Sequence, residues 1–382
     1  MGLDTRIGII GGGQLGKMLI LAAKQMGFMV NTLDPAPRCP SSSVSDSLIT
    51  AGFDDAEAIR RLAQRSDVLT FEFEHINAGI LAELEAEGAR VYPTAGSLRL
   101  IQNKLAQKER LFSAGLPVPE FRRLDNGGAL RGFAEKWGFP LMIKAARGGY
   151  DGKGNFLAKS FEEAEAARCL FAGREIFAER FVDFERETSV LACRGVNGET
   201  AVYAPGENIH EDSILRQTLA PADIGLAAAA RVMEISARVM EIFGGVGMFC
   251  VEFFLCRDGS ALVNEVAPRV HNSGHYTIEG CVTSQFEQHI RAIAGLPLGD
   301  ASPLAPAAVM MNLLGSGEKA GKAVVEGAAA ALAEPGVSLH IYGKEICAPK
   351  RKMGHITAVG RDLSETKRRC EAAFAKVRIR AE

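Results

Sequence analysis

The residues with the clearest chemical potential lie between positions 139 and 156, in the stretch FPLMIKAARGGYDGKGNF. Its first half reads as an apolar strand carrying Lys144, and its second half is a loop with four glycines before β-prone residues return. Glycines let consecutive backbone N–H groups turn inward, and such a concavity suits a phosphate. Lys144 and Lys153 would bring two cations to the same place. We expect a loop that covers a nucleotide, with a plain surface turn as the alternative.

Two glutamates form a second candidate site, in the stretch GMFCVEFFLCRDGSALVNEVAPRVHNSGHY. Two apolar strands flank Asp258-Gly259, which is a preferred centre of a two-residue hairpin loop. This register would place Glu252 directly opposite Glu265, where like charges are destabilising unless something neutralises them. Mg²⁺ binds carboxylate oxygens together with nucleotide phosphates, and Asn264 could add a ligand oxygen. We therefore expect a magnesium site, unless a β-bulge shifts the register and exposes one glutamate.

Further polar residues follow this hairpin. Arg269, His271 and Asn272 lie on an irregular segment with His275 and form a plausible site for an anion and polar groups. A single histidine in such a place is more often structural, and its spacing to other residues does not indicate a metal site.

The N-terminus begins with a strand, a glycine turn, a helix and a second strand that ends at Asp34. Gly11, Gly13 and Gly16 satisfy the G-x-G-x-x-G pattern of dinucleotide-binding domains. The motif requires only that backbone N–H groups at a helix N-terminus face an anion, so a single phosphate fits as well. A dinucleotide, another phosphate ligand and plain packing through glycine all remain open here.

Two pairs of charged residues have a functional and a neutral interpretation. Glu72 and Glu74 are two apart in the expected strand DVLTFEFEHI, so both would point to one face near the strand end, where α/β sheets bind ligands; a solvated edge is the alternative. Lys104 and Lys108 are four apart on a helix expected over residues 97–114, and a solvated cationic face is their default interpretation.

The bulk composition limits the classes of function. The 382 residues are 47% hydrophobic and 24% charged, with a formal net charge of −2, which indicates a globular chain and disfavours nucleic acid as the main partner. The eight cysteines show no C-x-x-C pair, which favours a reducing compartment. There is no signal-peptide pattern and no run of 18 apolar residues, so we expect a cytoplasmic protein without a membrane partner.

The order of the elements predicts a mixed α/β and α+β chain of three domains. Residues 1–96 would form a Rossmann-like parallel-sheet domain, residues 97–300 a central domain and residues 301–382 a small β-rich domain. The last domain has one chemical feature, the basic turn YGKEICAPKRKMGHI, which is either solvated or closes on a phosphate in the cleft.

Taken together, these stretches resemble the ATP-grasp superfamily and, within it, the N5-carboxyaminoimidazole ribonucleotide synthetase family of purine biosynthesis. The resemblance covers nearly the whole chain. Eight blocks stand in the family's order: GGGQLGKML, TFEFEHI, QNKLAQK, GGYDGKG, ERFVDFERE, NIHEDSILR, FFLCRDGSALVNEVAPRVHNSGH and KRKMGH.

The resemblance implies a set of site residues. ATP would contact Lys104, Lys144, Gly149, Tyr150, Asp151, Gly152, Lys153, Gly154, Asn155, Glu179, Arg180, Phe181, Val182, Glu187, His210, Asn264 and Glu265. Aminoimidazole ribonucleotide would contact Gln14, Leu15, Glu72, Glu74, Tyr150, Arg269, His271, Asn272, Lys344 and Arg351. The catalytic residues would be Tyr150, Asp151, Lys153, Arg269, His271 and Asn272, and the Mg²⁺ ligands Glu252 and Glu265.

The implied reaction is the ATP- and bicarbonate-dependent carboxylation of an amine through carboxyphosphate, in a protein that the family suggests is a homodimer. The alternatives are a formate-using or other ATP-grasp ligase, an NAD-dependent oxidoreductase and an ATP-binding module without turnover. The paired Glu252 and Glu265 argue against the last of these, and the glycine turn lacks nearby groups for the oxidoreductase.

Overall fold

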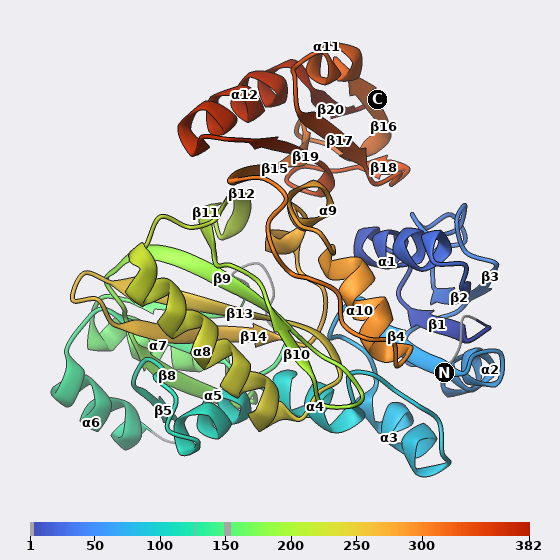
Figure 1. Cartoon of the computed structure of the whole chain (residues 1–382). Coiled ribbons are helices and arrows are strands. Elements are labelled where there is room, and N and C mark those ends of the chain that lie inside the picture. The colour runs from blue at the N-terminus through green and yellow to red at the C-terminus, as the bar shows by residue number, and fades with distance from the viewer. Residues whose placement is uncertain (1–3, 126, 149–153) are drawn as a thin grey trace.

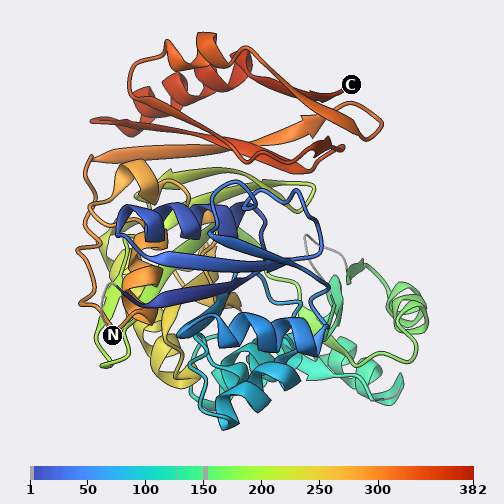
Figure 2. The same ribbon diagram turned by 90° about the vertical axis from the view of Figure 1, so that its right-hand side faces the viewer.

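The computed structural model describes residues 4–125, 127–148 and 154–382, and its strands form three sheets. The N-terminal and central parts lie side by side, and the C-terminal part lies across the top of both (Figures 1 and 2). The mixed α/β and α+β architecture agrees with the sequence prediction. No helix among the described ranges is long and apolar enough to cross a membrane.

The N-terminal sheet contains four parallel strands in the order β3-β2-β1-β4. Its helices cover the sheet faces, and the chain order is β1 (Arg6–Ile10), α1 (Gln14–Gln25), β2 (Met29–Asp34), β3 (Ser47–Thr50), α2 (Ala56–Gln64), β4 (Val68–Phe71) and α3 (Ala78–Ala86). The segment after α3 adds one parallel bridge to the sheet, between Leu69 and Val91.

Strand β4 is shorter than predicted, which corrects the expected geometry of the two glutamates. It ends at Phe71, so Glu72 and Glu74 lie beyond the strand and do not share a strand face. Phe73 turns aside and packs edge-on against Phe53, with ring centroids 4.5 Å apart. The aromatic contact ends the extended run and lets the two carboxylates reach different partners.

The single helix expected over residues 97–114 is two helices, α4 (Ala95–Ile101) and α5 (Lys104–Ser113). Asn103 breaks the run because its side chain accepts from the N–H of Ala106 and caps α5. The Gln102 amide donates to the carbonyls of Glu74 and Ile76, each at 2.7 Å. The break places Lys104 in the first turn of a new helix.

A small antiparallel sheet in the order β5-β8-β6-β7 carries the predicted strand, glycine loop and strand. Its elements are β5 (Phe121–Arg123), α6 (Gly127–Trp137), β6 (Leu141–Ala145), β7 (Asn155–Ala158), α7 (Phe161–Leu170) and β8 (Ile176–Arg180). Lys144 pairs with Asn155 across β6 and β7, so the two ends of the glycine loop are adjacent.

The large sheet begins with β14-β13-β9-β11-β12, and helix α8 packs against β9 and β13. These elements are β9 (Phe184–Arg194), β10 (Thr200–Val202), β11 (Gly206–Glu211), β12 (Ile214–Ala220), α8 (Gly225–Phe243), β13 (Gly247–Cys256) and β14 (Ala261–Ala267). A short segment follows, with η1 (Asn272–Gly274), α9 (Thr277–Gly280) and α10 (Gln285–Ile293).

The hairpin of β13 and β14 places Glu252 opposite Glu265, as predicted, but by a different route. The loop has three residues, because the N–H of Cys256 donates to the carbonyl of Ser260, and Gly259 takes a φ of +80°. A bulge between Glu252 and Phe253 leaves Asn264 as the extra residue and restores the predicted pairing. The prediction of a two-residue loop was therefore wrong, while the facing pair is confirmed.

The C-terminal strands continue the same large sheet instead of forming a separate one, because β15 pairs with β12. The elements are β15 (Ala307–Ser316), β16 (Gly321–Glu326), α11 (Ala328–Leu332), β17 (Val337–Ile341), β18 (Ile346–Cys347), β19 (Lys352–Gly360), α12 (Leu363–Lys376) and β20 (Arg378–Ala381). The alanine-rich residues 328–332 form the short helix α11, which packs on α12.

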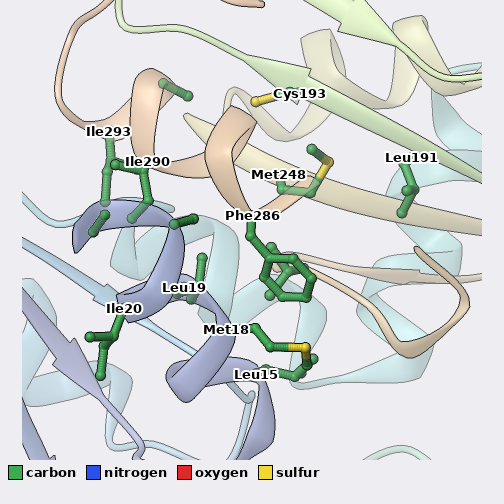
Figure 3. Packing of buried hydrophobic residues seen from close by; sticks show 14 of the residues in the cluster. Leu15, Met18, Leu19, Ile20, Leu191, Cys193, Met248, Phe286, Ile290 and Ile293 are labelled. Atoms are coloured by element: carbon green, nitrogen blue, oxygen red, sulfur yellow. The ribbon is translucent and has the colours of Figure 1, made fainter. Parts of the chain in front are cut away.

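One apolar core joins the N-terminal and central parts. Figure 3 shows Leu15, Met18 and Leu19 of α1 facing Phe286, Ile290 and Ile293 of α10. All six side chains are buried. The first turn of α1 is thereby held at a fixed position relative to the hairpin segment that precedes α10.

Candidate active site

A cleft lies between the small sheet, helix α5 and strand β14. It is lined by Lys104, Gln107, Lys108, Lys144, Asn155, Phe177, Asn264 and Glu265. These residues come from four stretches of the chain that are far apart in sequence. The cleft brings the lysine of the glycine-loop strand together with one glutamate of the hairpin.

Two lysines share the carboxylate of Glu179. Lys144 Nζ of β6 is 2.5 Å from Glu179 Oε1, and Lys108 Nζ of α5 is 2.5 Å from Oε2. Burial favours the neutral acid, but the two ammonium groups outweigh it and keep the pKa of Glu179 below its ordinary value. Lys108 is 4% exposed, so its interpretation as part of a solvated face is wrong.

Lys104 and Glu265 form a second pair at the same cleft, with Lys104 Nζ 3.0 Å from Glu265 Oε2. Burial opposes the ionised carboxylate, but Lys104 holds the pKa of Glu265 below its ordinary value. Burial and the facing Glu265 instead raise the pKa of Glu252 to about 7. Two negative charges on Glu252 and Glu265 are therefore unfavourable unless a further cation binds.

The bulge at Asn264 affects both sides of this pair. Asn264 lines the cleft beside Glu265 and also lines an adjoining cavity beside Glu252. Two carboxylates and an amide oxygen at one place are the hard oxygen donors that Mg²⁺ takes. Among the described residues no group of three or more His, Cys, Asp or Glu side chains is arranged to hold a metal ion.

The adjoining cavity contains Glu187 and His210, two of the residues expected to contact ATP. It is lined by Glu187, Thr188, Asn208, His210, Glu252, Phe253, Phe254 and Asn264. His210 Nδ1 pairs with the Glu187 carboxylate. Burial lowers the pKa of His210, but this hydrogen bond more than offsets the effect and raises the pKa overall.

The glycine turn before α1 is already bonded to a carboxylate from the chain itself. Gly13 N–H donates to Glu72 Oε1 at 2.5 Å and Gly16 N–H donates to Oε2 at 2.6 Å. A Cβ on Gly13 would lie 2.5 Å from Glu72 Oε1, so packing on Glu72 already requires glycine at this position. Between these two donors lie Gln14 and Leu15; the Leu15 side chain is buried, so only its backbone can meet a ligand.

Glu74 points elsewhere, to Arg269, whose Nε is 2.8 Å from Glu74 Oε1. His271 lies nearby, with Nε2 3.6 Å from Glu252 Oε1. The structure therefore brings Glu74, Arg269 and His271 to the junction between the N-terminal domain and the hairpin of β13 and β14. Asn272 is not brought there, because its amide exchanges two hydrogen bonds with Asn312 of β15, at 2.8 and 2.9 Å.

Basic residues of the C-terminal domain reach the start of α1. Burial and Arg351 lower the pKa of Lys344 to about 8, while Glu72 acts in the opposite direction. Lys17 of α1 donates to the carbonyl of Tyr342 at 3.1 Å, and Lys344 Nζ lies 5.8 Å from the Tyr342 ring centroid. Arg351 is exposed and donates to the carbonyl of Ile346 at 2.7 Å.

The remaining predicted residues divide into two groups. Arg180 ends β8 and lies over the Trp137 ring, and Phe181 and Val182 follow the strand, with Phe181 exposed. Gly154 and Asn155 begin the return from the glycine loop. The other predicted loop residues lie outside the described residues: Gly149, Tyr150, Asp151, Gly152 and Lys153.

Sequence reasoning missed three supporting residues. Lys108 was assigned to solvent, although it lies one turn after Lys104 on the same helix face. The Gln107 amide pairs with the backbone of Val266, next to Glu265, through bonds of 2.9 and 3.0 Å. Ser273 donates its backbone N–H to His271 Nδ1 at 3.3 Å. The spacing of Lys104 and Lys108 was the sequence signal for Lys108. The roles of Gln107 and Ser273 depend on long-range packing.

Comparisons with known proteins give the class first. Residues 109–286 match the ATP-grasp domain, residues 4–102 the ribonucleotide synthetase preATP-grasp domain, and residues 308–369 the phosphoribosylaminoimidazole carboxylase C-terminal domain. The chain is 43% identical to N5-carboxyaminoimidazole ribonucleotide synthase of Bacillus subtilis, over 92% of this chain and 90% of the relative.

Solved structures agree with this class. The N5-carboxyaminoimidazole ribonucleotide synthetase of Thermotoga maritima superposes with a TM-score of 0.90 at 44% identity, covering 99% of this chain and all of that one. The Aspergillus clavatus enzyme with ADP and 5-aminoimidazole ribonucleotide gives 0.89 at 34% identity, covering 98% and 99%. The chain belongs to the N5-carboxyaminoimidazole ribonucleotide synthase family of ATP-grasp proteins.

One relative is longer. The chloroplastic phosphoribosylaminoimidazole carboxylase of Vigna aconitifolia is 41% identical, and the match covers 94% of this chain but 65% of that protein. The chain thus spans about two-thirds of that relative.

Proposed function

We propose that this chain carboxylates 5-aminoimidazole ribonucleotide to N5-carboxyaminoimidazole ribonucleotide, consuming ATP and bicarbonate and releasing ADP and phosphate, in de novo purine biosynthesis. The observation that carries the proposal is the match to the Bacillus subtilis synthase over 92% of this chain, combined with a cleft of three lysines and two carboxylates. The substrate named in the Aspergillus clavatus complex supports the choice of acceptor.

Lys104 and Lys144 would bind the ATP phosphates, with the glycine loop above them. Lys108 shares the charge of Glu179, so Lys144 keeps positive charge for a phosphate. Because both Glu179 oxygens face lysines, we assign the adenine edge to Val182 and the ribose to Glu187, beside His210. Glu252, Glu265 and Asn264 would hold Mg²⁺, which when bound neutralises phosphate charge.

The ribonucleotide phosphate would lie at the first turn of α1. Glu72 occupies the N–H groups of Gly13 and Gly16, which leaves the Gln14 and Leu15 backbone for the phosphate, with Lys344 and Arg351 as counter-charges. This arrangement would place the base near Glu74 and Arg269. It also accounts for the G-x-G-x-x-G pattern without a dinucleotide.

Two steps complete the reaction. A bicarbonate oxygen attacks the γ-phosphorus, the bond from that phosphorus to the β–γ bridging oxygen breaks, and ADP leaves carboxyphosphate behind. The exocyclic amine of the ribonucleotide then attacks the carbonyl carbon of carboxyphosphate and displaces phosphate, or attacks the CO₂ left after carboxyphosphate has released phosphate. In either case the N–C bond forms and the amine gives up one proton. Positioning and charge neutralisation supply most of the catalysis in phosphoryl transfer, and water must be excluded from the fragile intermediate.

Two further properties are part of the proposal. All eight cysteines are free and six are buried, which supports a reducing, cytoplasmic compartment. A homodimer is expected from the family, and sedimentation of the purified chain measures it.

The test is coupled ADP release from the purified chain with Mg-ATP, 5-aminoimidazole ribonucleotide and bicarbonate, each omitted in turn. We expect ADP release to require the ribonucleotide and bicarbonate together. Release that depends on formate instead of bicarbonate would contradict the proposal and indicate another ATP-grasp ligase.

A further inference from the structure

The imidazole of His271 has different partners at its two nitrogens. Nδ1 accepts the backbone N–H of Ser273 at 3.3 Å and lies 2.8 Å from the Ser273 hydroxyl oxygen. Nε2 points to the other side, where Glu252 Oε1 is 3.6 Å away. The ring therefore has a buried, bonded face and a face toward the metal-binding hairpin.

A second serine sets the direction of the hydroxyl hydrogen bond. The Ser189 hydroxyl of β9 donates to Ser273 Oγ at 2.9 Å. Because Ser273 Oγ accepts this bond, its own hydrogen is available for His271 Nδ1. Cys250 Sγ, 3.7 Å from Ser273 Oγ, completes the buried surroundings, and Ser189 and Ser273 are 4% and 1% exposed.

The backbone of His271 is held as firmly as its ring. The Gln285 amide oxygen accepts the His271 N–H at 2.8 Å, and the Gln285 amide donates to the His271 carbonyl at 2.7 Å. Nδ1 accepts a backbone N–H, so it carries no hydrogen of its own. The ring then has its single hydrogen on Nε2.

We propose that Ser273, supported by Ser189, is a positioning residue that fixes His271 as the Nε2–H tautomer. His271 then offers a hydrogen-bond donor at the junction with Arg269 and Glu252, and does not act there as a general base. A donor at this place suits an anionic oxygen of the bicarbonate-derived group. This role in the reaction rests on the proposed function, whereas the tautomer itself does not.

The direct test is the tautomer in the free protein. Long-range ¹H–¹⁵N correlation spectra of ¹⁵N-histidine-labelled protein distinguish Nε2–H from Nδ1–H rings, and the His271→Asn variant identifies the signal of His271. We expect an Nε2–H pattern in the wild type and a mixed or Nδ1–H pattern in Ser273→Ala. The Ser189→Ala variant should show a smaller change, because the Ser273 hydroxyl remains.

Ser236→Ala is the matched control. Ser236 is also fully buried, but its hydroxyl donates to the carbonyl of Val232 within α8, away from the cleft. It should leave the His271 signal unchanged.

An Nδ1–H ring in the wild type, or a Ser273→Ala spectrum identical to that of the wild type, would overturn the proposal. If Ser273→Ala does not fold, the spectra of the wild type and of Ser189→Ala decide, and an Nδ1–H ring in both would overturn the proposal.

Kinetics test the role in the reaction separately. Ser273→Ala should lower kcat about tenfold, the effect of one well-placed hydrogen bond, and change the KM of ATP less than about twofold. An Nε2–H ring with unchanged kcat in Ser273→Ala would remove His271 orientation from the mechanism and leave the proposed reaction intact. Absence of ribonucleotide-dependent turnover in the wild type would instead reject the proposed reaction, while the spectrum still decides the tautomer.

Discussion

The carboxylate of Glu179 lies between Lys144 of β6 and Lys108 of α5, and all three side chains are largely buried. A single lysine against this carboxylate would have its charge cancelled. Two lysines leave the group with one net positive charge beside the cleft, where a polyphosphate needs it. In the proposed ATP site, Lys108 would therefore contribute to phosphate binding without having to touch the phosphate.

Replacing Lys108 by Met keeps the volume and removes the charge. We expect the KM of ATP to rise about tenfold or more, because Glu179 then neutralises Lys144, and we expect some loss of stability. Initial-rate kinetics at saturating ribonucleotide measure this change. Lys376→Met is the control, since Lys376 is an exposed partner of Glu334; an unchanged KM in Lys108→Met would contradict the charge argument.

We expect Lys344 to make binding of the ribonucleotide dependent on pH. Burial and Arg351 lower its pKa to about 8, so the amine loses its proton and its attraction for phosphate above that pH. The KM of the ribonucleotide should be flat from pH 7 to about 8 and then rise toward tenfold per pH unit. Lys344→Arg should remove the rise, because arginine stays charged. A wild-type KM that is flat up to pH 9 would remove Lys344 from the phosphate site.

At the scale of elements, the hairpin of β13 and β14 shows what local rules can predict. Alternation and the Asp-Gly turn led to the correct pairing of Glu252 with Glu265. The two irregularities that restore it, a three-residue loop and a bulge at Asn264, were not predicted. A bulge depends on contacts across the whole sheet, so a turn motif alone does not reveal it.

The break between α4 and α5 also depends on contacts between segments that are distant in the sequence. Asn103 was expected to lie within one helix because the local pattern is continuous. Its cap on Ala106 is a local contact, whereas the bonds of Gln102 to the Glu74 segment need the folded N-terminal domain. The break decides that Lys104 and Lys108 face the cleft. Their roles could therefore not be separated from a solvated face by spacing alone.

Glu265→Gln tests the element-scale prediction for metal binding. The amide keeps the shape but not the charge, so we expect turnover to fall by about a hundredfold or more and the fold to persist. Titration with Mn²⁺ as a paramagnetic probe should show weaker binding in the presence of ADP. Glu326→Gln, at an exposed pair with Arg380, is the matched control. Near-normal turnover in Glu265→Gln would reject Glu265 as a ligand.

At the scale of the whole molecule, His289 of α10 joins two domains. Its Nδ1 accepts the N–H of Met248 in β13 at 3.0 Å, and its Nε2 is 2.8 Å from the Thr70 hydroxyl in β4. The His289 side chain is fully buried, and its helix also carries Phe286 and Ile290 of the core shown in Figure 3. This joint fixes the N-terminal domain against the hairpin, and with it the distance from the glycine turn to Glu252.

His289→Ala should lower the free energy of unfolding by about 3 kcal/mol, because it leaves a cavity and two buried polar groups without partners. Burial lowers the pKa of His289 to about 3, so its contribution to stability is present above about pH 6.5 and is lost as the pH falls toward 3. Urea unfolding at several pH values should therefore show a smaller acid loss in the variant. The control is the exposed His75→Ala; equal acid losses in wild type and His289→Ala would contradict the assignment.

The parallel N-terminal sheet was predictable from the order of its strands and helices, but the continuity of the large sheet was not. The pairing of β12 with β15 joins segments on either side of α10, and no local pattern indicates it. The consequence is functional. The C-terminal basic turn is carried by the same sheet as Glu252, so Lys344 and the hairpin hold a defined relation across the site.

The most direct test of the proposed reaction follows the transferred carbon. The purified chain is incubated with Mg-ATP, ¹³C-bicarbonate and the ribonucleotide labelled with ¹⁵N at its exocyclic amine, and carbon spectra are recorded immediately because the carbamate is labile. The proposed function predicts a carbamate ¹³C signal split by the ¹⁵N label that appears only when ATP is present. ATP-dependent ADP release with no ¹³C–¹⁵N bond would contradict it.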